Sequence, residues 1–277
     1  MSSQASIADK VAREGNIFRK THSHSGRKVA ISPANSSMQH LCYARIRIDA
    51  RTPDVAFNTG NRETALICLD GEAEISAGKE KFTLNKYDAA YIPRGSEVKI
   101  HGQAADLAEF AADVEGDYPV QVVRYADVRA DKSLHLTVGG PATTRDLNIL
   151  VGKNVKAGRV LAGFTISDPG NWTSWPPHEH AKMLEEMYVY INMPAPGFGI
   201  QLVYNNTGYP EMLIPVREGD AVLMPSGYHP NVAVPGHSIG FLWAMAAHRE
   251  KEDRQFGVVN VQPDFSQQKS GLDASRK

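Results

Sequence analysis

Residues 88–97 read Asp-Ala-Ala-Tyr-Ile-Pro-Arg-Gly-Ser-Glu, and residues 220–229 read Asp-Ala-Val-Leu-Met-Pro-Ser-Gly-Tyr-His. Both segments predict a turn, a short apolar strand and a Pro-x-Gly turn that leads into the next strand. The two copies lie 132 residues apart. Similar segments at a fixed distance indicate an internal repeat, and this repeat decides how the chain is divided.

A glutamate upstream of each copy supports the repeat. Glu63 lies 30 residues before Pro93, and Glu185 lies 40 residues before Pro225. Each glutamate opens an apolar strand, TALICL in the first copy and EMYVYI in the second. The second copy therefore has about 10 extra residues, which we assign to the loop MPAPGFG.

The rest of the chain has many short apolar segments with alternating character, and turn residues separate them. The 23 glycines and 16 prolines fit such a turn-rich chain. Many short strands of this kind predict an all-β fold of the sandwich or barrel type. We expect two tandem β-barrels of one plan: an N-terminal arm over residues 1–27, a first barrel over 28–135, and a second barrel with a C-terminal tail over 136–277.

Composition limits the partners and the compartment. Thirty Lys and Arg against 31 Asp and Glu give a net charge of -1, which argues against nucleic-acid binding and gives no polybasic membrane anchor. The apolar stretch at 239–247 is too short to span a bilayer. Cys42 and Cys68 lie in apolar segments, which predicts buried thiols in a reducing cytoplasm. Exposed barrel edges predict a homo-oligomer.

The sharpest local feature is Pro176-Pro177-His178-Glu179-His180. In a strand, residues two apart share a face, so both histidines can point into a barrel interior. We expect Glu185, at the start of the next strand, and His229, after the Pro-x-Gly turn, to join them, with Glu186 facing the other way. Three imidazoles and a carboxylate suit Zn, Mn, Fe, Co or Ni.

The first copy lacks these ligands. Counting back from Glu63 by the same spacing gives Ala56 and Asn58 where the second copy has histidines, and Glu97 stands in the place of His229. We therefore expect no metal site in the first barrel, whose role would be structural.

This constellation resembles the cupin metal motif. Residues 163–180, GFTISDPGNWTSWPPHEH, together with LEEMYVYIN and GDAVLMPSGYHP, closely resemble the bicupin 5-deoxy-glucuronate isomerases of inositol catabolism, which are related to the 4-deoxy-5-ketouronate isomerases. The likeness is strong over roughly residues 140–247 and weaker in the first half. It implies two tandem cupin barrels, each a double-stranded β-helix or jelly roll.

The resemblance also implies an activity, the aldose–ketose isomerisation of 5-deoxy-glucuronate to 5-dehydro-2-deoxy-gluconate. His178, His180, Glu185 and His229 match the metal ligands of the family one for one. The implied cofactor is one divalent ion, with Zn as the first choice and Mn, Fe, Co or Ni as alternatives. Such an ion can polarise a carbonyl and its neighbouring hydroxyl.

Other residues are candidates for catalysis or substrate binding. The substrate carboxylate needs a cation of fork geometry, which Arg145 or Arg159 can supply, although either could instead make a structural salt bridge. The expected catalytic residues are Glu185, Lys182 and Tyr228. The alternatives are a solvated loop position for Lys182 and a core or rim position for Tyr228. Tyr190 is expected to bind substrate, with a core position as the alternative.

Two other functions remain open. The same ligands could serve another cupin metalloenzyme, such as an Fe(II) dioxygenase, or the chain could be a non-catalytic sugar-binding cupin. The tail after the last strand, AMAAHREKEDRQFGVVNVQPDF, also differs from the Gly-Pro and Trp-rich ending typical of the isomerases, so it can reshape the mouth of the pocket.

Overall fold

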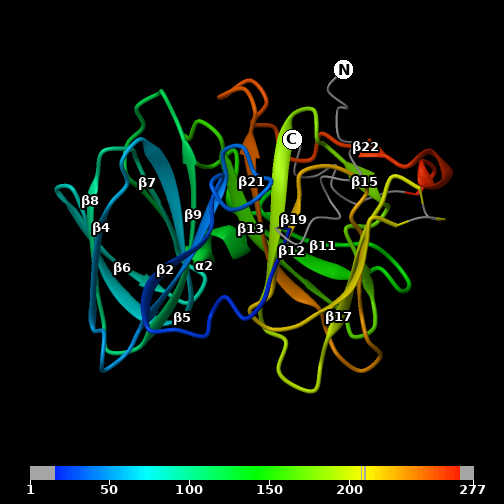
Figure 1. The fold of residues 1–277 in the computed structure, drawn as a ribbon, viewed down its shortest axis with the longest axis horizontal. Helices are drawn as coiled ribbons and strands as arrows, with labels where there is room; N and C mark the ends of the chain where they lie inside the picture. Colours follow the sequence, from blue (N-terminus) through cyan, green and yellow to red (C-terminus); the bar gives the residue numbers. More distant parts are fainter. Residues whose placement is uncertain (1–15, 207, 209, 269–277) are drawn as a thin grey trace.

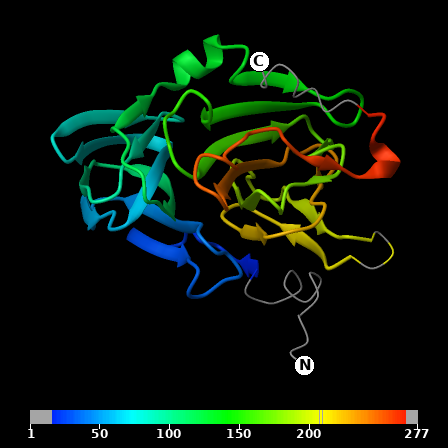
Figure 2. The same cartoon turned by 90° about the horizontal axis from the view of Figure 1, so that it is seen from above.

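The computed structural model describes residues 16–206, 208 and 210–268. Almost all regular structure in this part of the chain is β, which confirms the all-β prediction. Two bodies of β-structure lie side by side, one formed by the first half of the chain and one by the second (Figure 1). Seen from above, the chain passes between them through a short helical connector (Figure 2). We call them the first and the second unit.

The first unit is one strongly curled sheet of nine strands among the described residues. The long strand β5 organises it, because its start pairs with β7 and β9 and its far end pairs with β6 and β8. The strands are β2 (Gly26–Ile31), β3 (Cys42–Ile48), β4 (Asp54–Asn58), β5 (Arg62–Ala77), β6 (Glu80–Asn85), β7 (Ala89–Ile92), β8 (Glu97–His101), β9 (Ala105–Asp113) and β10 (Gln121–Val123). Helix α2 (Tyr125–Ala130) then leads to the second unit.

In the described residues, the second unit has a seven-stranded sheet, a four-stranded sheet and a two-stranded pair. The large sheet has the order β1-β19-β16-β21-β13-β12-β11, and the smaller one has the order β14-β20-β17-β18. The elements are β1 (Ile17–Phe18), β11 (His135–Val138), β12 (Arg145–Val151), β13 (Val160–Ser167), β14 (Trp172–Thr173), β15 (His178–Glu179), β16 (Leu184–Tyr190), β17 (Gly199–Val203), β18 (Met212–Val216), β19 (Ala221–Met224), β20 (Asn231–Ala233), β21 (Gly240–Ala247), β22 (Asn260–Val261) and the 3-10 helix η2 (Pro263–Phe265).

The start of the chain belongs to the second unit. Strand β1 pairs with β19, and the backbone N–H of Thr21 donates to Gly219. Asn16 is fully buried. The expected N-terminal arm is therefore packed where the structure describes it: residues 17–21 contact the second unit, and His24 and Ser25 bind the first. Residues 1–15 of that arm lie outside the described residues.

Strand register supports the internal repeat. Thr64 pairs with Ile92 in the first unit, and Glu186 pairs with Met224 in the second. Glu63 likewise stands opposite Ala112, as Glu185 stands opposite Ala246. The two copies thus place equivalent residues in equivalent register, and we interpret each unit as one barrel of a tandem pair.

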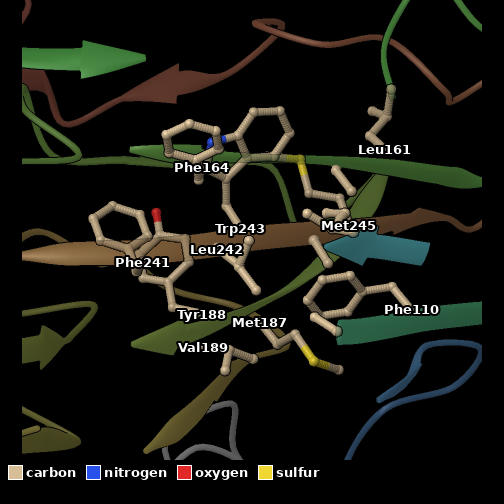
Figure 3. Close-up of a cluster of buried hydrophobic side chains, with 14 of the residues drawn as sticks. Phe110, Leu161, Phe164, Met187, Tyr188, Val189, Phe241, Leu242, Trp243 and Met245 are labelled. Atoms are coloured by element: carbon tan, nitrogen blue, oxygen red, sulfur yellow. The ribbon is translucent and has the colours of Figure 1, made fainter. Parts of the chain in front are cut away.

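A common apolar core joins the units. One cluster of buried side chains contains Phe110 from the first unit and Met187 from the second (Figure 3). Strand β13 lies against β5 and β9, which brings the outer faces of the two units together. A separate cluster that includes Ile46 and Leu66 lies within the first unit. Burial of this much apolar surface is the main driving force for the association of the two units.

Two buried glutamates reinforce this interface. The carboxylate of Glu63 accepts hydrogen bonds from the backbone N–H groups of Gly158, Arg159 and Val160, at 2.7, 2.6 and 2.7 Å. Tyr91 donates its hydroxyl to the same carboxylate at 2.7 Å. Hydrogen bonds to an ionised acceptor are about twice as strong as neutral ones. Here they satisfy the backbone N–H groups at the start of β13 across the interface.

Glu185 makes the mirror contact in the opposite direction. Its carboxylate accepts hydrogen bonds from the backbone N–H groups of Gln39, His40 and Leu41, at 2.6, 2.9 and 2.6 Å. These residues precede β3, the strand of the first unit that corresponds to β13 in register. Each unit therefore holds the other by one glutamate and three consecutive amides. We call this pair of contacts the glutamate clasp.

The remaining general expectations concern the thiols and the membrane. Cys42 and Cys68 are both buried and free, as predicted. Burial raises the pKa of the Cys68 thiol to about 12, so it stays protonated. None of the helices in the described part of the chain has the length and hydropathy of a membrane span.

The clasp predicts a stability defect in conservative variants. In Glu63→Gln or Glu185→Gln, an amide NH₂ would face backbone N–H donors and a buried charge-assisted hydrogen bond would be lost. We expect each variant to lower the free energy of unfolding by about 2–3 kcal/mol. Urea denaturation measures this, with the exposed Glu80→Gln as a control. Equal midpoints for all three variants would contradict the clasp.

Candidate metal centre and cavity

His180, Glu186 and His229 converge in the second unit. All three are buried, and their ligand atoms lie within 4.8 Å of one another. The Nε2 atom of His180 lies 2.9 Å from Oε2 of Glu186, and Nε2 of His229 lies 3.0 Å from the same oxygen. Ligand atoms on one ion, each bonded at about 2.0–2.2 Å, stand roughly 3 Å apart, so the arrangement fits a shared metal ion.

Local structure places each of these side chains. His180 follows β15, in a turn where its carbonyl accepts the backbone N–H groups of Met183 and Leu184. Glu186 lies on β16 in the middle of the large sheet. His229 follows Gly227, whose φ of 94° suits glycine and turns the chain into the site.

The predicted carboxylate ligand is wrong by one residue. Glu185 points to the first unit and is part of the glutamate clasp, whereas Glu186 points to the histidines. Adjacent strand residues face opposite sides, so only one of the two can enter the barrel. The same finding overturns Glu185 as a catalytic residue.

The histidine side chains are oriented as metal ligands are. Nδ1 lies 2.8 Å from the Pro176 carbonyl in His178, 3.1 Å from the Leu184 carbonyl in His180, and 2.8 Å from the Gly227 carbonyl in His229. A carbonyl only accepts, so each ring carries a proton on Nδ1 and leaves Nε2 for another partner. This backbone orientation of the distal nitrogen is typical of metal-bound histidine.

The Nε2 atom of His229 indicates that these residues can hold a metal ion. It is buried and lies 3.0 Å from Glu186, yet it makes no hydrogen bond of acceptable geometry among the described residues. A buried nitrogen in this position is explained by an ion between it and the carboxylate. The donor set of two imidazoles and one carboxylate therefore fits a divalent transition metal.

His178 lies beside this cluster rather than in it. Its ring centroid is 5.1 Å from that of His229 and 6.3 Å from that of His180. Burial, reinforced by the charge of His229, lowers the pKa of His178 to about 3, so the ring is neutral at pH 7. A neutral imidazole with Nδ1–H occupied presents Nε2 as a lone pair.

Electrostatics favour a charged carboxylate in the cluster. Burial alone would raise the pKa of Glu186, but the hydrogen bond with His180 and the nearby charges of His180 and His229 outweigh it and lower the pKa to about 2. The pKa of His180 is raised, because its bond to Glu186 outweighs the effect of burial. An ionised Glu186 is the form that binds a cation.

A cavity opens from the cluster into the barrel. Arg145 and Tyr188 are among its polar lining residues, and burial lowers the pKa of Arg145 to about 10, so the guanidinium is charged at neutral pH. The Tyr188 hydroxyl lies 2.7 Å from Ser174 Oγ, and burial keeps its pKa well above the usual value. The other lining residues are Val138, Leu147, Thr165, His178, His180, Leu184, Glu186, Ser174, Phe241, Trp243, Met245, Phe256, Gly257, Val258 and Val259.

Four other predicted site residues lie elsewhere. Arg159 donates to the carbonyls of Asp113, Ala247 and His248 at the interface of the units, so it is structural. The hydroxyl of Tyr190 donates to Gln201 in the core. Lys182 is exposed, and Tyr228 packs on Tyr204; neither lines the cavity. The structure therefore contradicts these predicted roles.

Several residues that line the cavity were not predicted from the sequence. Phe256 and the adjoining residues 257–259 come from the tail, whose unusual sequence was the only signal. Trp243 lies in the apolar run at 239–247, which reads only as a buried strand.

The chain is similar to the proteins of a known family. The model of the KduI/IolB family matches residues 17–262 of the chain. A 5-deoxy-glucuronate isomerase of Geobacillus kaustophilus is 26% identical over 239 residues, which cover 80% of this chain and 84% of the relative. The 5-deoxy-glucuronate isomerase of Bacillus licheniformis is 35% identical over 112 residues, or 38% and 41% of the two chains.

Solved structures agree on the fold. An IolB-like protein of Salmonella typhimurium superposes with a TM-score of 0.79 at 22% identity, covering 91% of this chain and 98% of the other. A variant of oxalate decarboxylase from Bacillus subtilis superposes with a TM-score of 0.62 at 13% identity, covering 83% and 76%. These similarities support the cupin-like β-fold.

The one-residue correction is directly testable. Glu186→Gln removes the carboxylate that faces the histidines, so we expect the metal content of the purified protein to fall by more than about tenfold. Glu185→Gln is the matched control, because it should lose stability and keep its metal. Elemental analysis of both proteins decides between them, and the reverse result would restore Glu185 as the ligand.

Proposed function

Because the chain belongs to the KduI/IolB family, we propose that it is a metal-dependent aldose–ketose isomerase of a small sugar acid. The proposed reaction converts 5-deoxy-glucuronate to 5-dehydro-2-deoxy-gluconate in the catabolism of myo-inositol. One observation carries the proposal: the buried His180–Glu186–His229 cluster opens onto a cavity in a chain whose matched relatives are named 5-deoxy-glucuronate isomerases.

We propose that His180, Glu186 and His229 hold one divalent ion and that His178 completes the ligand set. Zn²⁺ is the first candidate, and the nitrogen-rich donors also suit Mn, Fe, Co and Ni. When bound, such an ion supplies Lewis-acid polarisation of the substrate carbonyl and its neighbouring hydroxyl.

The other polar residues of the cavity would bind and orient the substrate. The guanidinium of Arg145 donates to the carbonyls of Thr143 and Trp175, at 2.9 and 2.7 Å, which orient it in the cavity wall. Its charge makes a substrate carboxylate a strong partner. Tyr188 stays protonated, and its ring centroid lies 5.9 Å from that of His229. Its hydroxyl, paired with Ser174, can therefore donate a hydrogen bond to a substrate oxygen near the ion and relay a proton between oxygens.

We propose a cytoplasmic location, which the two free and buried cysteines favour. A homo-oligomeric state stays a prediction from the sheet edges. Neither proposal affects the chemistry of the site.

Anaerobic turnover tests the reaction. We expect the metal-loaded protein to convert 5-deoxy-glucuronate to the ketose without oxygen, as followed by NMR, and to lose this activity after dialysis against a chelator. Oxygen-dependent turnover would instead identify a dioxygenase. Binding without turnover across a panel of uronates would identify a sugar-binding protein.

From the charge of Arg145 we expect KM to depend on substitution of this residue and on pH. A Gln in its place removes the cation, and we expect KM to rise by about tenfold or more, since a charge-assisted hydrogen bond contributes about 1.5–3 kcal/mol. In the wild type the charge is present below pH 10 and is lost as pH rises through about 10, so KM should rise there. Arg145→Lys is the control that keeps a cation. A KM unaffected by both substitutions would remove Arg145 from the site.

A further inference from the structure

The tail after β21 forms one wall of the cavity. Phe256, Gly257, Val258 and Val259 line the cavity together with the histidines. We call residues 249–262 the C-terminal strap. Since the strap lies beside the metal cluster, its contacts can affect which substrates fit.

The strap is anchored before the cavity. The guanidinium of Arg249 binds Asp253 within the strap, with Nη2 at 2.6 Å from Oδ1. Arg254 donates to the carbonyl of Val160 at 2.9 Å and to that of Gly152 at 3.0 Å. The two contacts of Arg254 fix the strap to the start of β13 and to the residue that follows β12.

The strap is anchored again after the cavity. Strand β22 pairs with β15, which carries His178, and the N–H of Gln262 donates to Pro177 at 2.9 Å. Tyr204 donates its hydroxyl to the side chain of Gln262 at 2.8 Å. With both ends held, the residues between them keep a defined position against the barrel.

Phe256 of the strap packs against Trp243 of β21. Their ring centroids are 5.0 Å apart with an interplanar angle of 29°, a stacked geometry. Trp243 pairs in register with Tyr188, and the two side chains lie in one cluster with Phe241 and Met245 (Figure 3). The strap therefore holds an indole ring that lines the cavity.

Trp243 has a polar group without a partner. Its side chain is 3% exposed, and its buried Nε1–H has no hydrogen-bond acceptor among the described residues. A buried donor left without an acceptor costs about 1–3 kcal/mol. Trp243 lines the cavity, so a bound ligand can supply the missing acceptor.

The position of this donor suits a sugar acid. Glu186 and Tyr188 are two residues apart on one face of β16, a separation of roughly 7 Å, and Trp243 stands beside Tyr188. Because Trp243 lines the cavity two residues further along the β16–β21 pair than Glu186, its indole can contact an oxygen of a polyhydroxy acid away from the reacting end. An apolar side chain at this place could not distinguish such an oxygen from a methylene.

We propose that Trp243 binds the substrate by donating its Nε1–H to a hydroxyl or carboxylate oxygen remote from the metal. Phe256 is then a positioning residue that acts through the indole. This inference rests on the proposed function, and it deepens that function by naming a contact that selects polyhydroxy acids. It also assigns a role to the tail, which the metal site leaves unused.

Steady-state kinetics with 5-deoxy-glucuronate test the contact. Trp243→Phe keeps an aromatic ring and removes the donor, so we expect KM to rise about tenfold with little change in kcat, the signature of lost uniform binding. Phe256→Leu should raise KM in the same way with the donor still present. Trp172→Phe is the matched control, because Trp172 does not line the cavity. Metal content and thermal unfolding check that the variants are intact.

The outcomes separate the two proposals. A wild type that neither turns over nor binds 5-deoxy-glucuronate overturns the proposed function and this inference with it. An active wild type together with an unchanged KM in Trp243→Phe overturns the inference alone.

A direct observation of the donor covers the case in which Trp243→Phe does not fold. The three tryptophans give three indole N–H resonances in the wild type, and Trp172→Phe and Trp175→Phe assign two of them. We expect the third to move downfield on addition of 5-deoxy-glucuronate. An unmoved resonance at saturating ligand would contradict the proposed hydrogen bond.

Discussion

The glutamate clasp is the constraint on which the rest of the structure depends. Glu63 and Glu185 each accept three consecutive backbone N–H groups from the other unit, at equivalent places in register. A buried carboxylate tolerates this environment only when its hydrogen bonds are satisfied, so the units can associate in one geometry. Because Glu185 is the second residue of β16, the clasp also sets which face of β16 the next residue takes, and that residue is Glu186.

The sequence predicted the all-β fold and two of the three residues of the candidate metal site. The repeat and the alternating apolar segments predicted an all-β chain, and His180 and His229 were predicted as ligands. The error at Glu185 has a physical cause. All residues of β16 are buried, one face against the first unit and the other in the barrel, so no polar alternation marks which glutamate points inward.

The rest of the site depends on contacts that the sequence does not encode locally. Arg159 and Tyr190 looked like pocket residues by type, but their partners are backbone carbonyls at the interface and a glutamine in the core. Phe256 reaches the cavity because the strap is anchored by Arg254 before it and by β22 after it, far along the chain from the histidines. Residue type and spacing predict which chemistry is available, whereas contacts between distant segments decide which residues meet at the site.

The clasp also orders events during synthesis. Glu63 leaves the ribosome long before residues 158–160 exist, and its strand can be hydrogen-bonded while its carboxylate is still hydrated. The backbone N–H groups of residues 39–41 likewise have no carboxylate partner until Glu185 has been synthesised. The nascent first unit therefore carries an incomplete polar patch beside an apolar face, and only the emergence of the second unit completes both. A chain truncated between the units would leave the buried carboxylate of Glu63 without these three amide donors and would expose the apolar face of the first unit to solvent.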